Sequence, residues 1–334
     1  MSKVTIRDIA KAAGVSVATV SYIINGKARC GETTRLKVEK VMQELNYRPN
    51  LAAKALATKR SHLIGFVLNK GLLQSNPFYS TLLSGMDAAL NREPDYDLVM
   101  GSCPDEASAQ EYLCEWVGKR NLDALVLMGL QNTELLCAVD RLDLPFVLID
   151  HQPQGFQHAI SVGSDDELGG YLATRHLLKK GYKGIAFVGD DLSGEVSRLR
   201  FCGFQRALKE AGVDYSETQR FCTEVSFEGG KQIADQLVED PNIQAVFAIA
   251  DIVAFGITAH LNARGHKIPE ELALIGFDNL EACQYMVPAL STIDQDVFSK
   301  GKTAVEQLLV RLRGSAQTES RVTIPLALVE RQTS

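Results

Sequence analysis

The chain has 334 residues, 46% of them hydrophobic and 23% charged, which predicts two or three folded domains and excludes a disordered or fibrous protein. Its net charge of −6 is uneven, because residues 1–60 carry +8 and the rest −14, so only the head is expected to bind a polyanion such as nucleic acid. No apolar run approaches the ~18 residues of a membrane span, no apolar signal segment begins the chain, and the seven scattered cysteines form no CxxC pair; we therefore expect a cytoplasmic protein with reduced thiols.

Three short helices are predicted in the head. A capping box at Thr5 begins the first helix and Gly14 ends it. Ser16 caps the second helix, which ends at Asn25-Gly26. Two short helices around a glycine-containing turn form the helix-turn-helix pattern, and a third helix over 32–45 completes the core. The residues expected on the inner faces are Val20, Ile23 and Ile24 of the second helix and Val38, Val41, Met42 and Leu45 of the third.

The second helix leaves small and polar side chains exposed, which suits close approach to a DNA major groove. Hydroxyl groups can bond to phosphates, and methyl groups can contact a thymine methyl. A generic three-helix bundle with a solvated face is the alternative. The exposed residues are Ser16, Val17, Ala18, Thr19, Ser21 and Tyr22.

An alanine-rich segment, 50–57, follows Pro49 and begins with Asn50, a good helix cap. Its eight residues fall short of the roughly 12–15 that an isolated helix needs in water. The segment is therefore expected to fold only when something packs on it. A plain linker is the alternative.

From residue 62 onward, short apolar strands alternate with amphipathic helices, the pattern of a doubly wound α/β body with parallel sheets. The number of strands exceeds one sheet, so we divide the body near residue 160 and return the segment after about 290 to the first half. Ligands in such folds bind at the carboxyl ends of the strands, here a cleft between two lobes. The expected strands are 63–68, 97–101, 124–128, 146–150, 185–188, 245–249 and 273–277, and the expected helices lie near 79–92, 106–120, 165–180, 198–211, 228–239, 253–265 and 297–313.

Several charged and aromatic residues fall at or just after strand ends. Carboxylates and a guanidinium around a shared cleft can hold a hydroxyl-rich ligand through charge-assisted hydrogen bonds, and an aromatic ring can cover its apolar face. Each residue alone is more often a cap, a turn residue or a surface ion pair. The candidates are Phe78, Tyr79, Asp150, Arg198, Arg200, Asp251 and Asp278.

Catalytic and metal-binding motifs are missing from the sequence. It holds no GxSxG elbow, no HExxH, no GxGxxG after a strand, and no histidine pair at metal-ligand spacing. Gly301-Lys302-Thr303 is similar to the end of a phosphate-binding loop, but the first glycine of that loop would fall at Asp296. We therefore expect no enzyme activity, no cofactor and no metal.

Longer segments of the sequence match the pattern of one protein family. The run VTIRDIAKAAGVSVATVSYIINGKARCGETTRLKVEKVMQELNYRPNLAAKALATKRSHLIGFVL resembles the DNA-binding head and hinge of the lactose/galactose repressor (LacI/GalR) family. The body matches in order with NPFYSTLLSGMDAAL, DALVLMG, LPFVLID, GGYLATRHLLKKGYKGIAFVG, SRLRFCGFQRAL, IPEELALIGFDN, VPALSTIDQD and LALVERQTS. The resemblance covers essentially the whole chain.

This resemblance implies a ligand-responsive transcriptional regulator, most often a repressor, that binds a pseudo-palindromic operator as a homodimer. Val17, Ala18 and Tyr22 would reach base edges. Segment 50–57 would be a hinge helix in the minor groove, with Leu56 as an apolar wedge. The other residues implied at the DNA are Thr5, Ser16, Thr19, Ser21, Asn25, Asn50 and Ala53.

The body would look like a periplasmic sugar-binding protein with a small-molecule effector between its lobes. Phe78, Asp150, Arg200 and Asp278 would line that pocket, with Tyr79 beside them. The implied domains are a head, 1–48; a hinge and linker, 49–60; and a body, 61–334, whose N-subdomain is about 61–161 and 291–322 and whose C-subdomain is about 162–290 and 323–334.

Departures from the family pattern bear on specificity. Many relatives have Arg where this chain has Tyr22, and a Val-Ser pair where it has Cys30-Gly31. A frequent Asn-Asp pair is Ala250-Asp251 here, which removes an amide often turned toward a sugar. An aromatic expected near 225 is replaced by Val225 or displaced to Phe227.

Alternatives stay open at this stage. A sugar or sugar derivative ranks first as the effector, ahead of a purine, and a protein coregulator is a further alternative. VPALSTIDQ is similar to the purine-responsive branch, whereas Gly194 and Val196 depart from it. From other classes, the body could be an enzyme on a doubly wound fold, or a sensor whose basic head serves as an interaction module.

Overall fold

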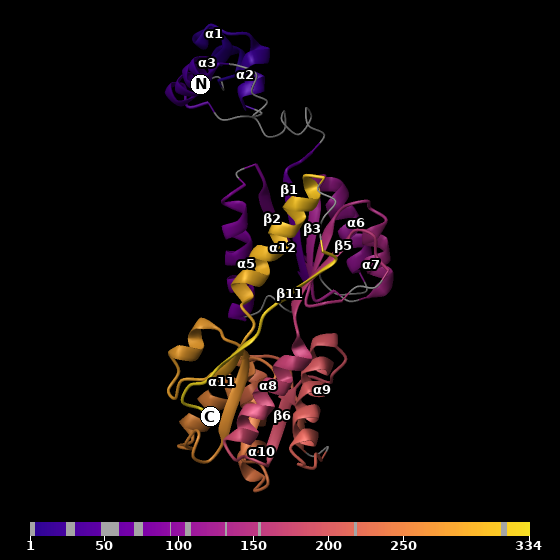
Figure 1. Ribbon diagram of the computed structural model, residues 1–334, viewed down its shortest axis with the longest axis vertical. Helices are drawn as coiled ribbons and strands as arrows, with labels where there is room; N and C mark the ends of the chain where they lie inside the picture. The colour runs from indigo at the N-terminus through magenta and orange to yellow at the C-terminus, as the bar shows by residue number, and fades with distance from the viewer. Residues whose placement is uncertain are drawn as a thin grey trace. The chain divides into compact units, whose positions relative to one another are not determined.

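The computed structural model describes residues 4–24, 31–47, 60–69, 76–93, 95–103, 108–130, 132–152, 155–216, 219–314 and 319–334. They fall into two compact units, a head within 1–62 and a body over 63–334 (Figure 1). Among the described residues, no helix has both the length and the apolar character to cross a membrane.

The head is a helical unit around a small apolar core in which Ile9, Val20 and Val38 are fully buried. The predicted place of Leu45 in that core is wrong, because Leu45 is 39% exposed. The third helix ends just before it, and Tyr47 packs against the core in its place, with its amide bonded to the Met42 carbonyl. The head helices are α1 (Ile6–Ala13), α2 (Val17–Ile24) and α3 (Glu32–Glu44).

The first lobe of the body holds a six-stranded parallel sheet in the order β11-β5-β4-β3-β1-β2. Its central strands are buried on both faces, which explains their continuous apolar runs. Helices α5 and α12 lie side by side against one face, and α6 and α7 cover the other (Figure 1). The elements are β1 (Leu63–Asn69), α5 (Pro77–Leu90), β2 (Asp97–Cys103), α6 (Ala109–Arg120), β3 (Ala124–Met128), α7 (Thr133–Asp140), β4 (Phe146–Ile149), β5 (Ala159–Ser164), α12 (Val297–Leu312) and β11 (Arg321–Ile324).

The second lobe repeats the plan with the strand order β12-β10-β9-β8-β6-β7, parallel except for β12, which runs antiparallel to β10. Helices α8 and α9 pack together, as do α10 and α11. The elements are α8 (Asp166–Lys179), β6 (Ile185–Gly189), α9 (Glu195–Glu210), β7 (Arg220–Cys222), α10 (Phe227–Glu239), β8 (Ala245–Ala248), α11 (Asp251–Ala263), β9 (Ala273–Asp278), a 3-10 turn Glu281–Gln284, β10 (Ser291–Asp294) and β12 (Ala327–Val329).

The chain passes between the lobes after β5, after β10 and after β11. The predicted α/β architecture is confirmed, but the lobe limits differ from the expected ones at three strands. β5 and β11 belong to the first sheet although 162–164 and 323–324 were assigned to the C-subdomain, and β10 belongs to the second sheet although 291–294 were assigned to the N-subdomain. The strands β5, β7, β10, β11 and β12 and the helix α7 were not predicted.

Candidate functional site

The second helix of the head presents an exposed face. Val17 is 42% and Tyr22 56% exposed, while Ser16 and Ala18 are also exposed and Thr19 and Ser21 are half-buried. Ser16 Oγ accepts a hydrogen bond from the Thr19 amide at 3.0 Å, so it caps α2 as predicted. The tight turn before the helix depends on Gly14, whose φ of 64° favours glycine.

Thr5 begins the first helix through Asp8, as the capping box predicts. Its amide and its hydroxyl both donate to Asp8 Oδ2, at 2.9 and 2.7 Å. These bonds lower the pKa of the Asp8 carboxyl. Contacts of this face with DNA stay a prediction, and four of the expected DNA-binding residues lie outside the described residues: Asn25, Asn50, Ala53 and Leu56.

A cavity of about 230 Å³ lies between the two lobes of the body. Its wall is built by residues at or after the carboxyl ends of strands in both sheets, the place where doubly wound folds bind ligands. All five predicted effector residues line it: Phe78, Tyr79, Asp150, Arg200 and Asp278. The other lining residues are Asn76, Met128, Gly129, Ile149, Asp190, Val196, Ser197, Val225, Ile249, Ala250 and Gln295.

Two acidic residues of the wall occupy unusual backbone conformations. Asp150 follows β4 with a φ of 54°, and Asp278 ends β9 with a φ of 121°. Residues other than glycine rarely adopt positive φ, and such strain is concentrated at binding sites. Both backbones turn at the strand end, where the two carboxyl groups meet the cavity.

Arg200 enters the wall from α9 and is held at three points. Its Nε donates to Asp166 Oδ1 at 2.8 Å, and its Nη1 donates to the Ile249 carbonyl at 2.7 Å. The guanidinium lies 3.5 Å from the centre of the Phe277 ring. With 5% exposure, the side chain is a fixed cation whose charge Asp166 balances.

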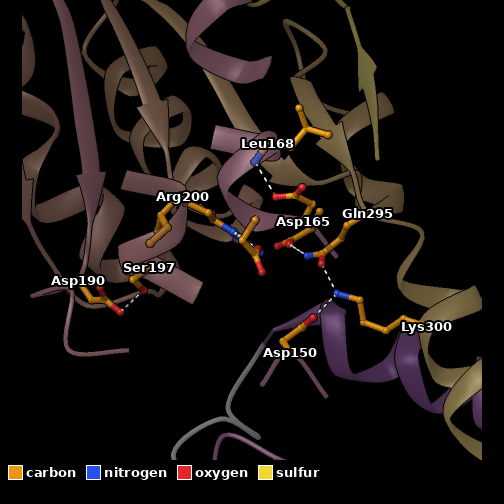
Figure 2. A network of polar contacts seen from close by, with 11 residues as sticks. Asp150, Asp165, Leu168, Asp190, Ser197, Arg200, Gln295 and Lys300 are labelled. Atoms are coloured by element: carbon orange, nitrogen blue, oxygen red, sulfur yellow. Dashed lines mark hydrogen bonds and ion pairs between the residues drawn. The ribbon is translucent and has the colours of Figure 1, made fainter. Parts of the chain in front are cut away.

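A chain of hydrogen bonds joins the lobes beside the cavity (Figure 2). Asp278 of the second lobe accepts from Gln295 Nε2 at 2.5 Å. Gln295 lies in the crossover after β10, and its Oε1 accepts from Lys300 Nζ in α12. Lys300 also donates to Asp150 Oδ1 at 2.5 Å, which completes the path into the first lobe.

Burial governs the acidities of the site. It raises the pKa of Asp278 to about 8, with Asp251 adding to the rise and Arg200, Gln295 and Lys300 opposing it. Burial likewise raises the pKa of Asp166 against the opposing charge of Arg200. Asp278 is therefore largely protonated at neutral pH.

Two further aspartates of the second lobe cap a helix and order a loop, Asp165 and Asp190. Asp165 accepts from the Leu168 amide at 2.9 Å, and Asp190 accepts from the Ser197 hydroxyl at 2.7 Å (Figure 2). Ser197 and Asp190 both line the cavity. Their role there was not anticipated.

Two other candidates from the sequence lie away from the cavity. Arg198 is exposed on α9. Asp251 is fully buried and accepts from the Leu280 amide, the Cys283 thiol and the Thr292 hydroxyl at 2.6–3.0 Å, so it fixes the loop after β9. Its neighbour Ala250 lines the cavity in its place.

The family pattern places an aromatic residue near position 225, on the second-lobe side of the cavity. In this chain that residue is replaced by a valine, and among the described residues no neighbouring aromatic takes its place in the cavity wall. Val225 lines the cavity, whereas Phe227 packs against the core. Gln295 and Lys300 were missed. Gln295 follows a strand that was not predicted, and a lysine inside an amphipathic helix carries no sequence signal of burial.

An exposed helix-turn-helix face and a two-lobed body with a cavity between its lobes define a DNA-binding regulator under ligand control. The family model described as "Bacterial regulatory proteins, lacI family" matches residues 5–50, and a "Periplasmic binding protein-like domain" model matches residues 174–334. The chain belongs to the lacI family of bacterial regulatory proteins.

The relatives cover between four fifths and nearly all of the chain. The HTH-type transcriptional repressor PurR of Vibrio atlanticus is 32% identical, with 98% of each protein covered. The lac repressor dimer bound to operator and the anti-inducer ONPF superposes with a TM-score of 0.83 at 26% identity, covering 99% of both chains. A LacI family regulator from Enterococcus faecium with bound ribose superposes with a TM-score of 0.72 at 30% identity over 81% of this chain and 98% of that one.

Proposed function

We propose that this regulator is a repressor that binds a pseudo-palindromic operator as a homodimer and takes a neutral, hydroxyl-rich small molecule, a sugar or sugar derivative, between its lobes. The observation that carries the proposal is the composition of the cavity wall. Carboxyl groups of Asp150 and Asp278 and the guanidinium of Arg200 stand beside the rings of Phe78 and Tyr79. This combination suits a ligand with polar edges and an apolar face.

The charge balance of the wall favours a neutral ligand over an anionic one. Arg200 is paired with Asp166, and Lys300, directly behind the wall, is paired with Asp150. Within the described lining, neither cation is left to compensate a phosphate or carboxylate. The cavity volume of about 230 Å³ lies below the roughly 300–1,000 Å³ of drug-sized sites, which suits a single small ring.

The relatives support the DNA and sugar parts of the proposal. The lac repressor structure is a dimer on operator DNA, and the Enterococcus faecium regulator holds ribose. A two-fold dimer predicts two half-sites related by symmetry. A protein that acts on chromosomal operators works in the cytoplasm, and the role proposed for the cavity is binding, not turnover.

Ligand control requires a moving part between cavity and head. We propose that ligand changes the balance between two lobe arrangements, and that the lobes set the spacing of the paired segments 50–57 in the dimer. Ligand and operator must then change each other's affinity by the same factor, typically 5–150-fold or about 1–3 kcal/mol. A ligand that binds both arrangements equally would switch nothing.

A thermal-shift screen of the purified protein tests the ligand class. Neutral pentoses and hexoses are expected to raise the melting temperature, whereas sugar phosphates and adenine are not. Each stabilising compound is then added to a gel-shift titration against an operator selected from randomised duplexes. A response to sugar phosphates alone, or no change of operator affinity with any stabilising compound, would contradict the proposal.

A further inference from the structure

Lys300 is the fully buried lysine of the described chain, with 0% exposure. Burying an ammonium group is unfavourable unless the group is paired and hydrogen-bonded. Its Nζ donates to Asp150 and to Gln295 and lies 6.0 Å from the ring centre of Phe78. All three partners line the cavity, and Lys300 itself lies behind them.

The ammonium fixes the orientation of the Gln295 amide. A lysine can only donate hydrogen bonds, so the atom of Gln295 that faces it must be the carbonyl Oε1. The amide nitrogen then points the other way and donates to Asp278 Oδ1. Because that nitrogen cannot accept, any proton on Asp278 must reside on Oδ2.

Lys300 fixes Asp150 by the same reasoning. One carboxylate oxygen, Oδ1, accepts from the ammonium, and the ion pair keeps Asp150 an acceptor. Within the described residues, no hydrogen bond reaches the second oxygen of Asp150 or of Asp278. These two oxygens, one from each lobe, are left for a ligand.

We infer that Lys300 is a positioning residue that decides which polar atoms the cavity wall offers to its ligand. This inference rests on the proposed function of the cavity. With Lys300 in place, Asp150 offers a fixed acceptor, and a ligand must bring a hydroxyl or N–H donor to it. Without the ammonium, the side-chain amide of Gln295 can rotate by half a turn, and Asp150 loses its counter-ion. The wall then no longer selects for a ligand that places a donor at Asp150.

Several other charged and titratable groups surround Lys300. Asp150 from the end of β4, Asp278 from the end of β9 and the Arg200–Asp166 pair of α9 and α8 lie around the same wall, with the phenol of Tyr79 on α5. The ammonium opposes the rise of the Asp278 pKa. Its removal is therefore expected to raise that pKa further, an effect that a space-filling role would not produce.

The test compares Lys300→Met with Lys302→Met. Both remove one positive charge from α12, but Lys302 is partly exposed and lies 3.7 Å from Glu306. Carbon-13 NMR titration of the Asp278 carboxyl, assigned with Asp278→Asn, is expected to show an upward shift of its midpoint in Lys300→Met alone. An unchanged midpoint in a folded Lys300→Met protein would overturn the inference.

Calorimetry with D-ribose, D-glucose, D-gluconate and adenine supplies the second readout. The neutral probe that binds the wild type is expected to bind Lys300→Met about tenfold more weakly, and Lys302→Met with unchanged affinity. Wild-type affinity in Lys300→Met would refute the role. If no probe binds the wild type, the proposed ligand class fails, and the NMR titration still decides the role of Lys300.

Asp150→Asn serves if Lys300→Met does not fold. This substitution keeps the Oδ1 acceptor for Lys300 but replaces the second carboxylate oxygen with an NH2 donor. The affinity of the variant for the same probe is expected to fall about tenfold. Where Lys300→Met folds, the two losses should not add in the double variant, because Lys300 acts through Asp150. Retained probe affinity in Asp150→Asn, or additive losses in the double variant, would contradict the inference.

Discussion

Arg200 and Asp166 form a buried ion pair between α9 and α8, with 2.8 Å between Nε and Oδ1 and side-chain exposures of 6% and 5%. The same two helices also carry an exposed pair, Arg206 and Glu167, at 2.5 Å and with side-chain exposures of 42% and 39%. One helix contact therefore contains two arginine–carboxylate pairs that differ mainly in burial.

The first prediction compares the two arginines. Arg200→Met leaves the Asp166 carboxylate buried and unpaired, so the free energy of unfolding should fall by about 3–5 kcal/mol. Arg206→Met removes an exposed pair and should cost no more than about 1 kcal/mol. Urea unfolding followed by circular dichroism measures both. Equal losses in the two variants would show that burial of the first pair has no energetic weight.

A second prediction follows from the acidity of Asp278. Its pKa in the folded protein is raised to about 8 from 3.8, mainly by burial. The folded state therefore binds this proton more tightly than the unfolded chain, and the resulting stability is fully present below about pH 4 and is lost as the pH rises through 8. Asp278→Asn removes this dependence.

The measurement is urea unfolding of both proteins across that pH range. The wild type should lose stability relative to Asp278→Asn as the pH rises, by no more than about 6 kcal/mol. Asp166, whose pKa is also raised, titrates in both proteins and cancels in the difference. Asp251 repels Asp278, so its own raised pKa falls when Asp278 is replaced, and the difference reports the pair. Parallel pH profiles for the two proteins would contradict the prediction.

The sequence predicted the central strands and most helices because their burial dictates their composition. Four of the strands that were missed, β7, β10, β11 and β12, have only three or four residues. β10 reads STID although Ser291 and Thr292 are fully buried. The Thr292 hydroxyl donates to Asp251, and the Ser291 hydroxyl accepts from the Arg331 amide, so neither hydroxyl is left unsatisfied. The sequence does not reveal these hydrogen bonds, because the partners lie about 40 positions away in the chain.

Some residues of the candidate site could be predicted from the sequence, and others could not. Residues at predicted strand ends, such as Asp150 and Asp278, could be placed because parallel strands converge at one edge of a sheet. Lys300 could not, since its acid partner lies 150 positions earlier in the chain. Asp251 was placed near the ligand by its position after a strand, but its hydrogen bonds turn it into the loop after β9.

A third prediction concerns the contact between α5 and α12. A Cβ atom on Gly85 would lie 2.0 Å from the Phe298 carbonyl oxygen, and one on Gly301 would lie 2.0 Å from that of Leu82. The clashing atoms belong to the backbone of the neighbouring helix, which cannot move aside as the end of a flexible side chain can. Gly85→Ala and Gly301→Ala should therefore each lower the free energy of unfolding by about 1–3 kcal/mol or more.

Gly118 of α6 provides the matched control, because no atom lies within 4 Å of a Cβ built there. Gly118→Ala should stabilise the protein by about 0.5–1 kcal/mol through the higher helix propensity of alanine. Urea unfolding measures all three variants. Destabilisation by Gly118→Ala, or tolerance of alanine at both 85 and 301, would show that the helices do not depend on this close approach.

The last prediction tests the exposed face of α2. Tyr22 is 56% exposed and makes no contribution to the buried core of the head, so Tyr22→Ala should leave the unfolding free energy within about 0.5 kcal/mol. Loss of a base contact should weaken binding to a selected operator about tenfold, or about 1.4 kcal/mol. Leu36→Ala, which removes a 59% exposed side chain from α3, should change neither quantity.

Salt separates a base contact from a phosphate contact. The basic head predicts that log affinity falls steeply with log salt concentration for any duplex, because bound counterions are released. Tyr22→Ala should keep the wild-type salt slope while losing the preference for operator over unrelated duplex, as a base contact requires. A Tyr22→Ala protein that keeps that preference would remove Tyr22 from base recognition and leave the specificity of α2 to Val17 and Ala18.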